Sequence, residues 1–142
     1  MTAELAFLVA TALYAGFQWC VQLVVYPQFA AVAPADFAAY EAAHQRRITP
    51  LVGVLFVGLA GAGGWLLLGA APATPGWLIA VALALVAAVP VLTGVGAVPQ
   101  HRVLSTGWDP AAAHRLRRVD RWRTAGATGA LVLAVVMVAV AT

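Results

Sequence analysis

Four long stretches without a charged residue alternate with short charged segments along this chain. They cover residues 5–26, 48–69, 77–98 and 125–142. A membrane-spanning helix needs roughly 20 mostly apolar residues, so each stretch is long enough to cross a bilayer or nearly so. The pattern predicts one domain, 1–142, that is an all-α integral membrane four-helix bundle. Its spans are expected at about 5–26, 48–69, 77–98 and 123–142.

The first stretch also carries polar side chains at a regular interval. Tyr14, Gln18, Gln22 and Tyr26 are spaced four apart, and residues four apart lie on the same face of a helix. A glutamine that faces lipid leaves its amide unpaired, at a cost of roughly a few kcal/mol. We therefore expect this stripe to face other protein or a small cavity, and Tyr14, Gln18 and Gln22 are candidate substrate-binding residues.

Two short amphipathic segments lie between the spans. After span one, Phe37, Tyr40, His44 and Ile48 recur at helical spacing and form one face of a helix. This helix lies at the membrane interface or leads directly into span two. A second, basic helix is expected over 111–121, because aspartate followed by proline is typical of a helix start. The bundle should thus carry short interfacial helices on one side.

Composition and charge support a membrane location. Hydrophobic residues make up 63 % of the chain and charged residues 9 %, against about 25 % charged in soluble domains. Lysine is absent, and the eight basic residues are arginines that lie between spans one and two or between spans three and four. The positive-inside rule predicts a multi-pass protein of the cell membrane with these loops in the cytoplasm and both termini outside. The expected surroundings are the lipid bilayer, and the net charge of +3 does not indicate nucleic-acid binding.

Small residues are frequent on spans two and four. Glycines recur over 53–64, and Ala125 and Gly129 are four apart. Small residues let helices approach closely within a membrane. The pattern permits a homo-oligomer, and it serves packing within one chain equally well.

The chemically active side chains are expected to meet near the cytoplasmic leaflet. Tyr26 closes span one, His44 lies one turn before span two, and His101 follows span three. In an antiparallel bundle these groups can line one pocket, and ionisable residues at membrane depth indicate function. The candidate catalytic residues are His44, His101, Tyr26, Tyr40 and Glu41. The candidate substrate-binding residues around them are Tyr14, Gln18, Gln22, Arg47, Trp122 and Arg123.

Several roles remain open for these groups. His44 can act as a base with His101 as its partner, or the two can ligate a single metal ion or a haem, although their spacing is not diagnostic of either. Each histidine can instead form hydrogen bonds between helices. Glu41 and Asp120 can form ion pairs with Arg47 and Arg123. Nucleophilic catalysis is poorly supported, because the one serine, Ser105, lacks a nucleophile motif.

Several short motifs resemble a family of bacterial four-helix membrane proteins. They are Gln18-Trp19 with Gln22, Val25-Tyr26-Pro27-x-Phe29, Phe37-x-x-Tyr40-x-x-x-His44-x-x-Arg47-Ile48, Pro99-x-His101-x-x-Leu104 and Trp122-Arg123-Thr124. Together they cover nearly the whole chain and are similar to the anthrone oxygenase-like domain of unknown function. The resemblance implies a four-helix fold. It also implies oxidation of an aromatic polyketide-like compound without an obvious cofactor, or another step of specialised metabolism.

The sequence therefore predicts an intramembrane enzyme that acts on a small hydrophobic substrate. The resemblance favours an oxygenase that is cofactor-independent or metal-assisted. An acid–base isomerase or cyclase would use the same pocket without oxygen. A non-catalytic transporter or accessory membrane subunit is the third alternative.

Overall fold

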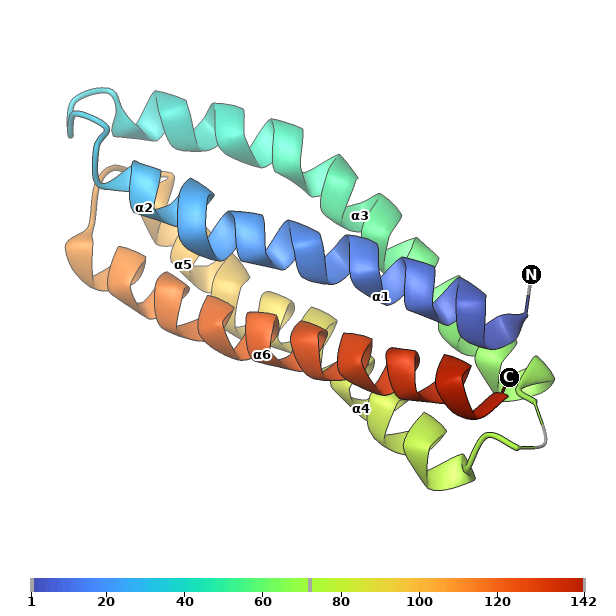
Figure 1. The fold of residues 1–142 in the computed structure, drawn as a ribbon. Coiled ribbons are helices and arrows are strands. Elements are labelled where there is room, and N and C mark those ends of the chain that lie inside the picture. Colours follow the sequence, from blue (N-terminus) through green and yellow to red (C-terminus); the bar gives the residue numbers. More distant parts are fainter. Residues whose placement is uncertain (1, 72, 142) are drawn as a thin grey trace.

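The structure, a computed structural model, describes residues 2–71 and 73–141 and folds them into four long antiparallel rods (Figure 1). The predicted domain begins at Met1 and ends, with its last span, at Thr142, and these two residues lie outside the described ones. The first rod consists of α1 (Ala3–Cys20), η1 (Val21–Val25) and α2 (Tyr26–Phe29), and the second is α3 (Phe37–Gly69). The third rod consists of α4 (Gly76–Leu92), η2 (Thr93–Ala97) and α5 (Val98–Leu104), and the fourth is α6 (Pro110–Ala141). η1 and η2 are π-helical turns.

The predicted all-α bundle is confirmed, and the protein is a multi-pass membrane protein. Each rod is long and apolar enough to cross a bilayer, with mean hydropathy between 1.6 and 2.6 over its most apolar window. Large apolar side chains lie on the outside of the bundle. Leu68 is 92 % exposed and Val57 is 74 % exposed. Large exposed apolar surfaces are rare on soluble monomers, whereas lipid solvates them readily.

The predicted short interfacial helices are not separate elements. The segment from Phe37 onward is the first part of α3, which runs through Pro50 without a break, and the basic segment is the first part of α6. A proline within a membrane helix is tolerated where neighbouring helices support the backbone. The start predicted for the basic segment is confirmed, since Asp109 caps α6 by accepting a hydrogen bond from the Ala112 N–H (2.8 Å).

The two π-helical turns each precede a proline by two residues. Pro27 follows η1 and Pro99 follows η2. A proline has no N–H, and its ring clashes with the carbonyl four residues earlier in a regular helix. Widening the preceding turn relieves that clash, and in both turns the closing N–H bonds to the carbonyl five residues back. The first span was expected to end at Tyr26, but the rod widens just before that residue and continues to Phe29.

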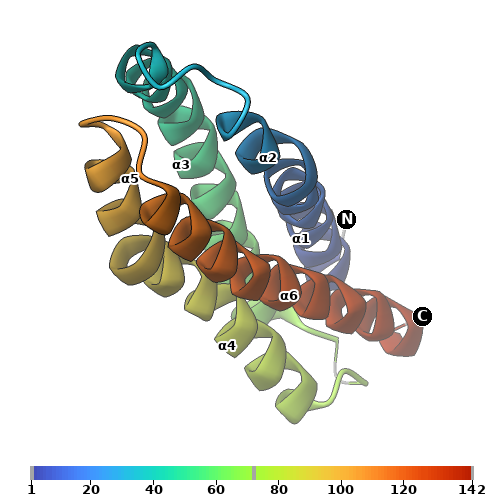
Figure 2. The same cartoon turned by 90° about the vertical axis from the view of Figure 1, so that its left-hand side faces the viewer.

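The rods do not pack evenly around the bundle. α1 packs against both α3 and α6, and α6 also packs against α4, whereas α3 has few contacts with α4 and α5. Viewed from one end, the order is α3, α1, α6, α4, with α3 standing apart from the third rod (Figure 2). We call the boundary between α3 and the third rod the open seam.

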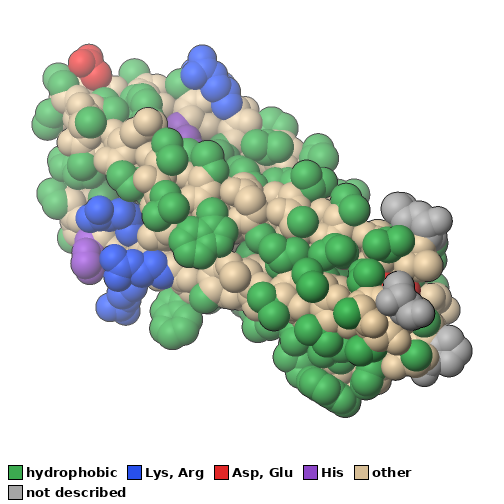
Figure 3. Space-filling model, in the orientation of Figure 1, with side chains coloured by type: hydrophobic (Ala, Val, Ile, Leu, Met, Phe, Trp, Pro, Cys, Tyr) green, Lys and Arg blue, Asp and Glu red, His purple; other side chains and the backbone are tan. Residues whose placement is uncertain are grey.

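The two ends of the bundle differ in charge. Both chain ends and the 70–75 connection lie at one end, which we call the terminal end (Figure 1). The connections 30–36 and 105–109 lie at the other, and the arginines visible in Figure 3 gather toward it. We call this the basic end. At about 1.5 Å per residue, α3 is about 50 Å long, longer than the roughly 30 Å hydrocarbon core. Its first, charged turns therefore extend beyond the core at the basic end.

Candidate functional site

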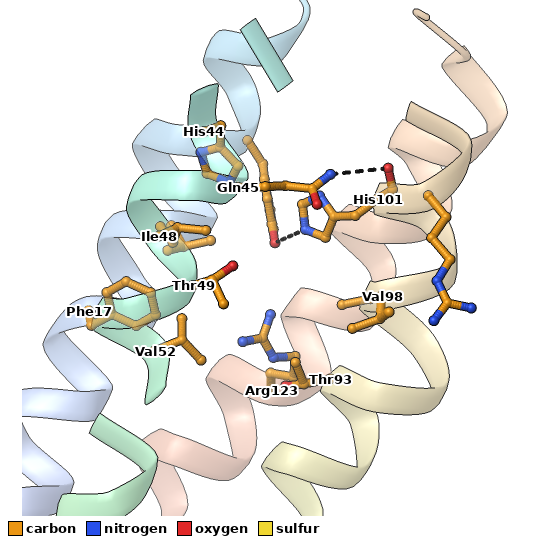
Figure 4. A pocket seen from close by; sticks show the side chains of 14 residues that line it. Phe17, His44, Gln45, Ile48, Thr49, Val52, Thr93, Val98, His101 and Arg123 are labelled. Carbon is orange, nitrogen blue, oxygen red and sulfur yellow. Dashed lines mark hydrogen bonds between the residues drawn. The ribbon is translucent and has the colours of Figure 1, made fainter. Parts of the chain in front are cut away.

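A cavity of about 260 Å³ lies between the four rods in the half of the bundle toward the basic end. All four rods contribute to its wall. Its polar lining includes His44, Gln45, His101 and Arg123, and Figure 4 shows Arg123 and Thr93 opposite the two histidines. The other lining residues are Phe17, Val21, Tyr26, Ile48, Thr49, Val52, Ala97, Val98 and Arg102. We call this space the polar cavity.

A chain of hydrogen bonds leads from a buried carboxylate to the wall of the polar cavity. Oε1 of Glu41, whose side chain is fully buried, lies 2.6 Å from Nδ1 of His101. Nε2 of the same ring lies 3.3 Å from the hydroxyl oxygen of Tyr26. Gln45 supports the arrangement, because its amide nitrogen donates to Oε1 of Glu41 (2.9 Å) and to the backbone carbonyl of His101 (3.4 Å).

The Glu41 carboxylate determines which nitrogen of His101 carries a proton. An ionised carboxylate only accepts hydrogen bonds, so Nδ1 must be the donor in this contact. In the neutral ring the other nitrogen, Nε2, is then an acceptor for the Tyr26 hydroxyl. The resulting order of carboxylate, imidazole and hydroxyl is the arrangement that makes an imidazole an oriented base. We call it the Glu41–His101–Tyr26 relay.

His44 lies beside the relay on the cavity wall. Its ring centroid is 5.9 Å from that of His101 and 5.1 Å from the edge-on ring of Phe29. A metal ion held by both histidines would need a free nitrogen on each, but both nitrogens of His101 are already engaged. Among the described residues, no three His, Cys, Asp or Glu side chains are close enough to form a metal site. The donor set thus fits proton transfer better than metal binding.

A second polar network lies deeper in the bundle, between α1 and α6. The Tyr14 hydroxyl donates to Oε1 of Gln18 (3.2 Å), and the Gln18 amide donates to Oδ1 of Asp120 (3.1 Å). Arg123 closes the ring by donating to Oδ1 of Asp120 (3.1 Å) and to the Tyr14 oxygen (3.4 Å). Asp120 is 0 % exposed and Arg123 is 4 % exposed. We call these four residues the α1–α6 network.

Arg123 belongs to both the network and the cavity. Its side chain lines the cavity floor while its NH1 nitrogen holds Asp120. A guanidinium carries five N–H donors, of which the contacts above use two, and Nε has no partner in the structure. The floor of the polar cavity is therefore a cation whose donors are only partly satisfied.

The structure brings together some of the predicted site residues. Tyr26, His44, His101 and Arg123 line the polar cavity, and Glu41 lies directly behind His101. Tyr14 and Gln18 are buried as expected, but within the α1–α6 network and not on the cavity wall. Of the two ion pairs considered, Asp120 pairs with Arg123, whereas Glu41 bonds to His101 and not to Arg47.

Other predicted residues lie apart from the cavity. Tyr40 and Arg47 line a neighbouring depression on α3 that shares His44 and Ile48 with the polar cavity, and Tyr40 packs against Phe29 and Phe37. Trp122 is 68 % exposed and lies on the outside of α6. Gln22 lines a different groove between α1, α4 and α6.

The position of Gln22 follows from the drift of a four-residue stripe. Residues four apart on a regular helix turn by about 40° at each step, so Gln22 lies away from the face of Tyr14 and Gln18, and Val21 is buried in its place. The widened turn comes after Gln22: the Tyr26 N–H bonds to the carbonyl of Val21, five residues back, in place of Gln22. The added residue returns Tyr26 to the buried face. Four-residue spacing does not reveal such a turn, although Pro27 is a signal that regular hydrogen bonding ends nearby.

Four polar lining residues were not anticipated from the sequence. They are Gln45, Thr49, Thr93 and Arg102. Gln45 lies four residues after Glu41, the spacing at which a glutamine can hydrogen-bond a carboxylate on the same helix. Thr49 then continues the same face, so the sequence held a signal for both. Thr93 lies in the π-helical turn before Pro99, where regular spacing gives no guide.

No family model, curated protein or solved structure matches this chain.

Proposed function

We propose that this protein is a membrane-embedded enzyme that moves a proton to or from a small hydrophobic substrate in the polar cavity. The observation that carries the proposal is the Glu41–His101–Tyr26 relay, which ends on the wall of a cavity of about 260 Å³. Substrate pockets are mostly apolar with a few convergent polar groups, and this cavity fits that description. A group used only for helix packing would not need an open space beside it.

The relay supports a balanced proton transfer. The Tyr26 oxygen accepts a proton from the substrate while its own hydroxyl proton passes to Nε2 of His101. The imidazolium that forms keeps its Nδ1–H bond to the Glu41 carboxylate, which stabilises the positive charge. Reversal of these steps returns the proton to a different atom of the substrate. General acid–base catalysis of this kind contributes about 10²–10⁴-fold to a rate.

Arg123 supplies the complementary charge. Removing a proton from a carbon next to a carbonyl, or from a phenol, leaves negative charge on the substrate oxygen. The guanidinium on the cavity floor lies opposite the histidines (Figure 4). Fixed donors aimed at developing negative charge are a large contribution to catalysis in a site that excludes water. The substrate is therefore expected to place an oxygen toward Arg123 and the acidic proton toward Tyr26.

The same first step serves two of the functions expected from the sequence. An isomerase or cyclase needs only proton transfer, whereas a cofactor-independent oxygenase lets the deprotonated substrate react with molecular oxygen. Proton exchange that is independent of oxygen, with no oxygen incorporated into any product, indicates the isomerase. Incorporation of oxygen from labelled O₂ indicates the oxygenase that the family resemblance implies.

Deuterium exchange tests the proposal without knowledge of the natural product. The purified protein in lipid nanodiscs is incubated in D₂O with a panel of hydrophobic phenols and enolisable ketones, and mass spectrometry follows deuterium at carbon. The wild type should accelerate exchange for at least one compound. Tyr26→Phe keeps the ring contacts of Tyr26 but removes the relay hydroxyl, and should slow that exchange about 10²-fold or more.

Tyr40→Phe is the matched control. It removes the same hydroxyl from a ring outside the polar cavity and should leave exchange unchanged. Equal exchange in the wild type and Tyr26→Phe, with Tyr26→Phe folded as judged by its tryptophan emission, would contradict the proposed role of the relay.

We also propose that the basic end faces the cytoplasm and that both termini lie outside the cell membrane. The arginines lie within the helices, and those visible in Figure 3 gather toward the basic end, while the 70–75 connection carries no charge. This distribution follows the positive-inside rule. Reporter fusions at the C-terminus that are active only outside the cytoplasm would support this orientation, and activity only inside would reverse it.

A further inference from the structure

A second hollow follows the open seam toward the terminal end. It has a volume of about 400 Å³ and lies between α3 and α4. Its wall contains no charged residue: it is lined by Phe56, Leu59, Ala60, Gly63, Gly64, Leu67, Leu83, Val86, Ala87 and Pro90. We call it the seam groove.

The seam groove continues the polar cavity on both of its walls. On α3, the cavity lining ends at Val52 and the groove lining begins at Phe56, one helical turn further on. On the opposite wall, the cavity lining ends at Thr93 and the groove begins three residues away at Pro90. Residues three or four apart are neighbours on one face of a helix. The two hollows therefore adjoin, from the two histidines toward the apolar part of the bundle.

We propose that the seam groove holds a long apolar tail of the substrate whose reactive, oxygen-bearing head occupies the polar cavity. The inference rests on the proposed function and adds the class of substrate. From Val52 to Leu67 the two hollows extend about 22 Å, at 1.5 Å per residue. The head would lie near the basic end and the tail would point along the bilayer normal, as the tails of membrane lipids do.

The dimensions of the groove favour a single tail over the other possible occupants. Its 400 Å³ extends along about 16 Å of α3, so the groove is long and narrow. An apolar space of this shape suits one chain of methylene groups. A helix of a second copy, about 10 Å across with its side chains, would place only a ridge of side chains in it. A phospholipid carries two chains, and its headgroup would have to occupy the polar cavity.

The open seam also explains how such a molecule would enter. Because α3 has few contacts with α4 and α5, the groove and the cavity open sideways between these rods. Thr49 and Val98, on either side of the cavity mouth, are both exposed. A tailed substrate dissolved in the bilayer can move into the seam without leaving the membrane.

Binding of a homologous series tests the inference. The probes are 4-alkylphenols with tails from methyl to hexadecyl, and quenching of tryptophan emission in nanodiscs reports binding. Concentrations are expressed as mole fraction in the bilayer, so that partitioning of longer tails into lipid does not count as affinity. The affinity of the wild type should rise several-fold as the tail lengthens and then level off when the groove is full.

Gly64→Leu fills the groove without disturbing the polar cavity. No atom lies within 4 Å of a Cβ placed at Gly64, so the leucine should occupy the space proposed for the tail. Long-tailed phenols should lose their several-fold advantage, while 4-methylphenol binds as before. Gly61→Leu is the matched control, because Gly61 is exposed and lies outside the groove. Its affinities should equal those of the wild type.

The outcomes separate this inference from the proposed function. Affinity independent of tail length, equal loss in the two leucine variants, or no binding by any member of the series would overturn the tail site. A change from dimer to monomer caused by Gly64→Leu, seen by native mass spectrometry, would overturn it in favour of a second copy. Tail-dependent binding without deuterium exchange would retain the tail site and contradict the proposed enzyme.

Discussion

The two polar clusters differ in where they lead. The α1–α6 network is a closed ring between two helices that pack closely, and its members bond mainly to one another, although Oδ2 of Asp120 and Nε of Arg123 have no partner. The Glu41–His101–Tyr26 relay joins three rods and ends on a cavity. Both contain a buried carboxylate and a basic group, but the network reaches the cavity only through Arg123, whereas the relay ends there on the Tyr26 hydroxyl.

This difference assigns the two clusters to different tasks. Burying an acid and an arginine within a bundle is unfavourable unless they remain paired, so the closed ring fixes the distance and the register of α1 against α6. The relay ends on the cavity and can exchange its Tyr26 hydrogen bond for one to a substrate. Replacing a residue of the α1–α6 network should therefore mainly reduce stability, whereas replacing a residue of the Glu41–His101–Tyr26 relay should mainly reduce activity.

The largest expected effect is that of Asp120→Ala. The change leaves the Arg123 guanidinium buried without its counter-charge, and breaking a buried pair in this way costs about 3–5 kcal/mol. Unfolding in mixed micelles, followed by tryptophan emission, should show a loss of this size. A loss of stability below about 1 kcal/mol would mean that the α1–α6 network does not stabilise the fold, since such a small loss is typical of surface substitutions.

The double variant Asp120→Leu with Arg123→Met sharpens the same comparison. It replaces both charges by apolar groups, which is often neutral or stabilising for a buried pair. The double variant should be more stable than Asp120→Ala although it carries one more substitution. Because Arg123 also lines the cavity, the double variant should still lose activity.

Glu41→Gln is expected to have the next largest effect, on activity. The amide nearly preserves the shape of the side chain but no longer holds the Nδ1–H form of His101 by charge, and loss of that control in a related arrangement costs up to about 10⁴-fold. Deuterium exchange on a responsive probe should fall by about 10²-fold or more. The stability loss should stay near 1–3 kcal/mol, below that of Asp120→Ala, and the reverse order would contradict the division of tasks.

The spans could be predicted from the sequence because the bilayer imposes a simple rule. About 20 apolar residues without charge form a spanning helix, and each predicted stretch lies within one rod, as far as the residues are described. The helix ends were less predictable. The charged residues before Ile48 left open whether that segment lies at the membrane interface or leads directly into span two. The second alternative is confirmed, since α3 continues through Pro50 and its charged turns extend beyond the hydrocarbon core without a break.

The site was only partly predictable, for a reason that Gln22 and Glu41 illustrate. A four-residue stripe drifts by about 40° at each step of a regular helix, which leaves Gln22 off the buried face, and the π-helical turn at η1 then returns Tyr26 to that face. Spacing also does not reveal which side chain across the bundle meets a carboxylate. Glu41 meets His101, 60 residues away along the chain, and that contact depends on how the rods are ordered.

The smallest expected effect is that of Gln22→Leu, and its comparison with Gln18→Leu tests whether Gln22, at the start of η1, lies off the face that buries Gln18. Gln18 is fully buried and bonds to Tyr14 and Asp120, so its loss should cost about 1–3 kcal/mol. Gln22 faces a groove, and its Oε1 is buried without a partner. Replacing it with leucine removes an unsatisfied polar atom, and unfolding should therefore shift by no more than about 0.5 kcal/mol in either direction. Equal losses in the two variants would mean that the four-residue stripe continues through this turn, with Gln22 turned inward like Gln18.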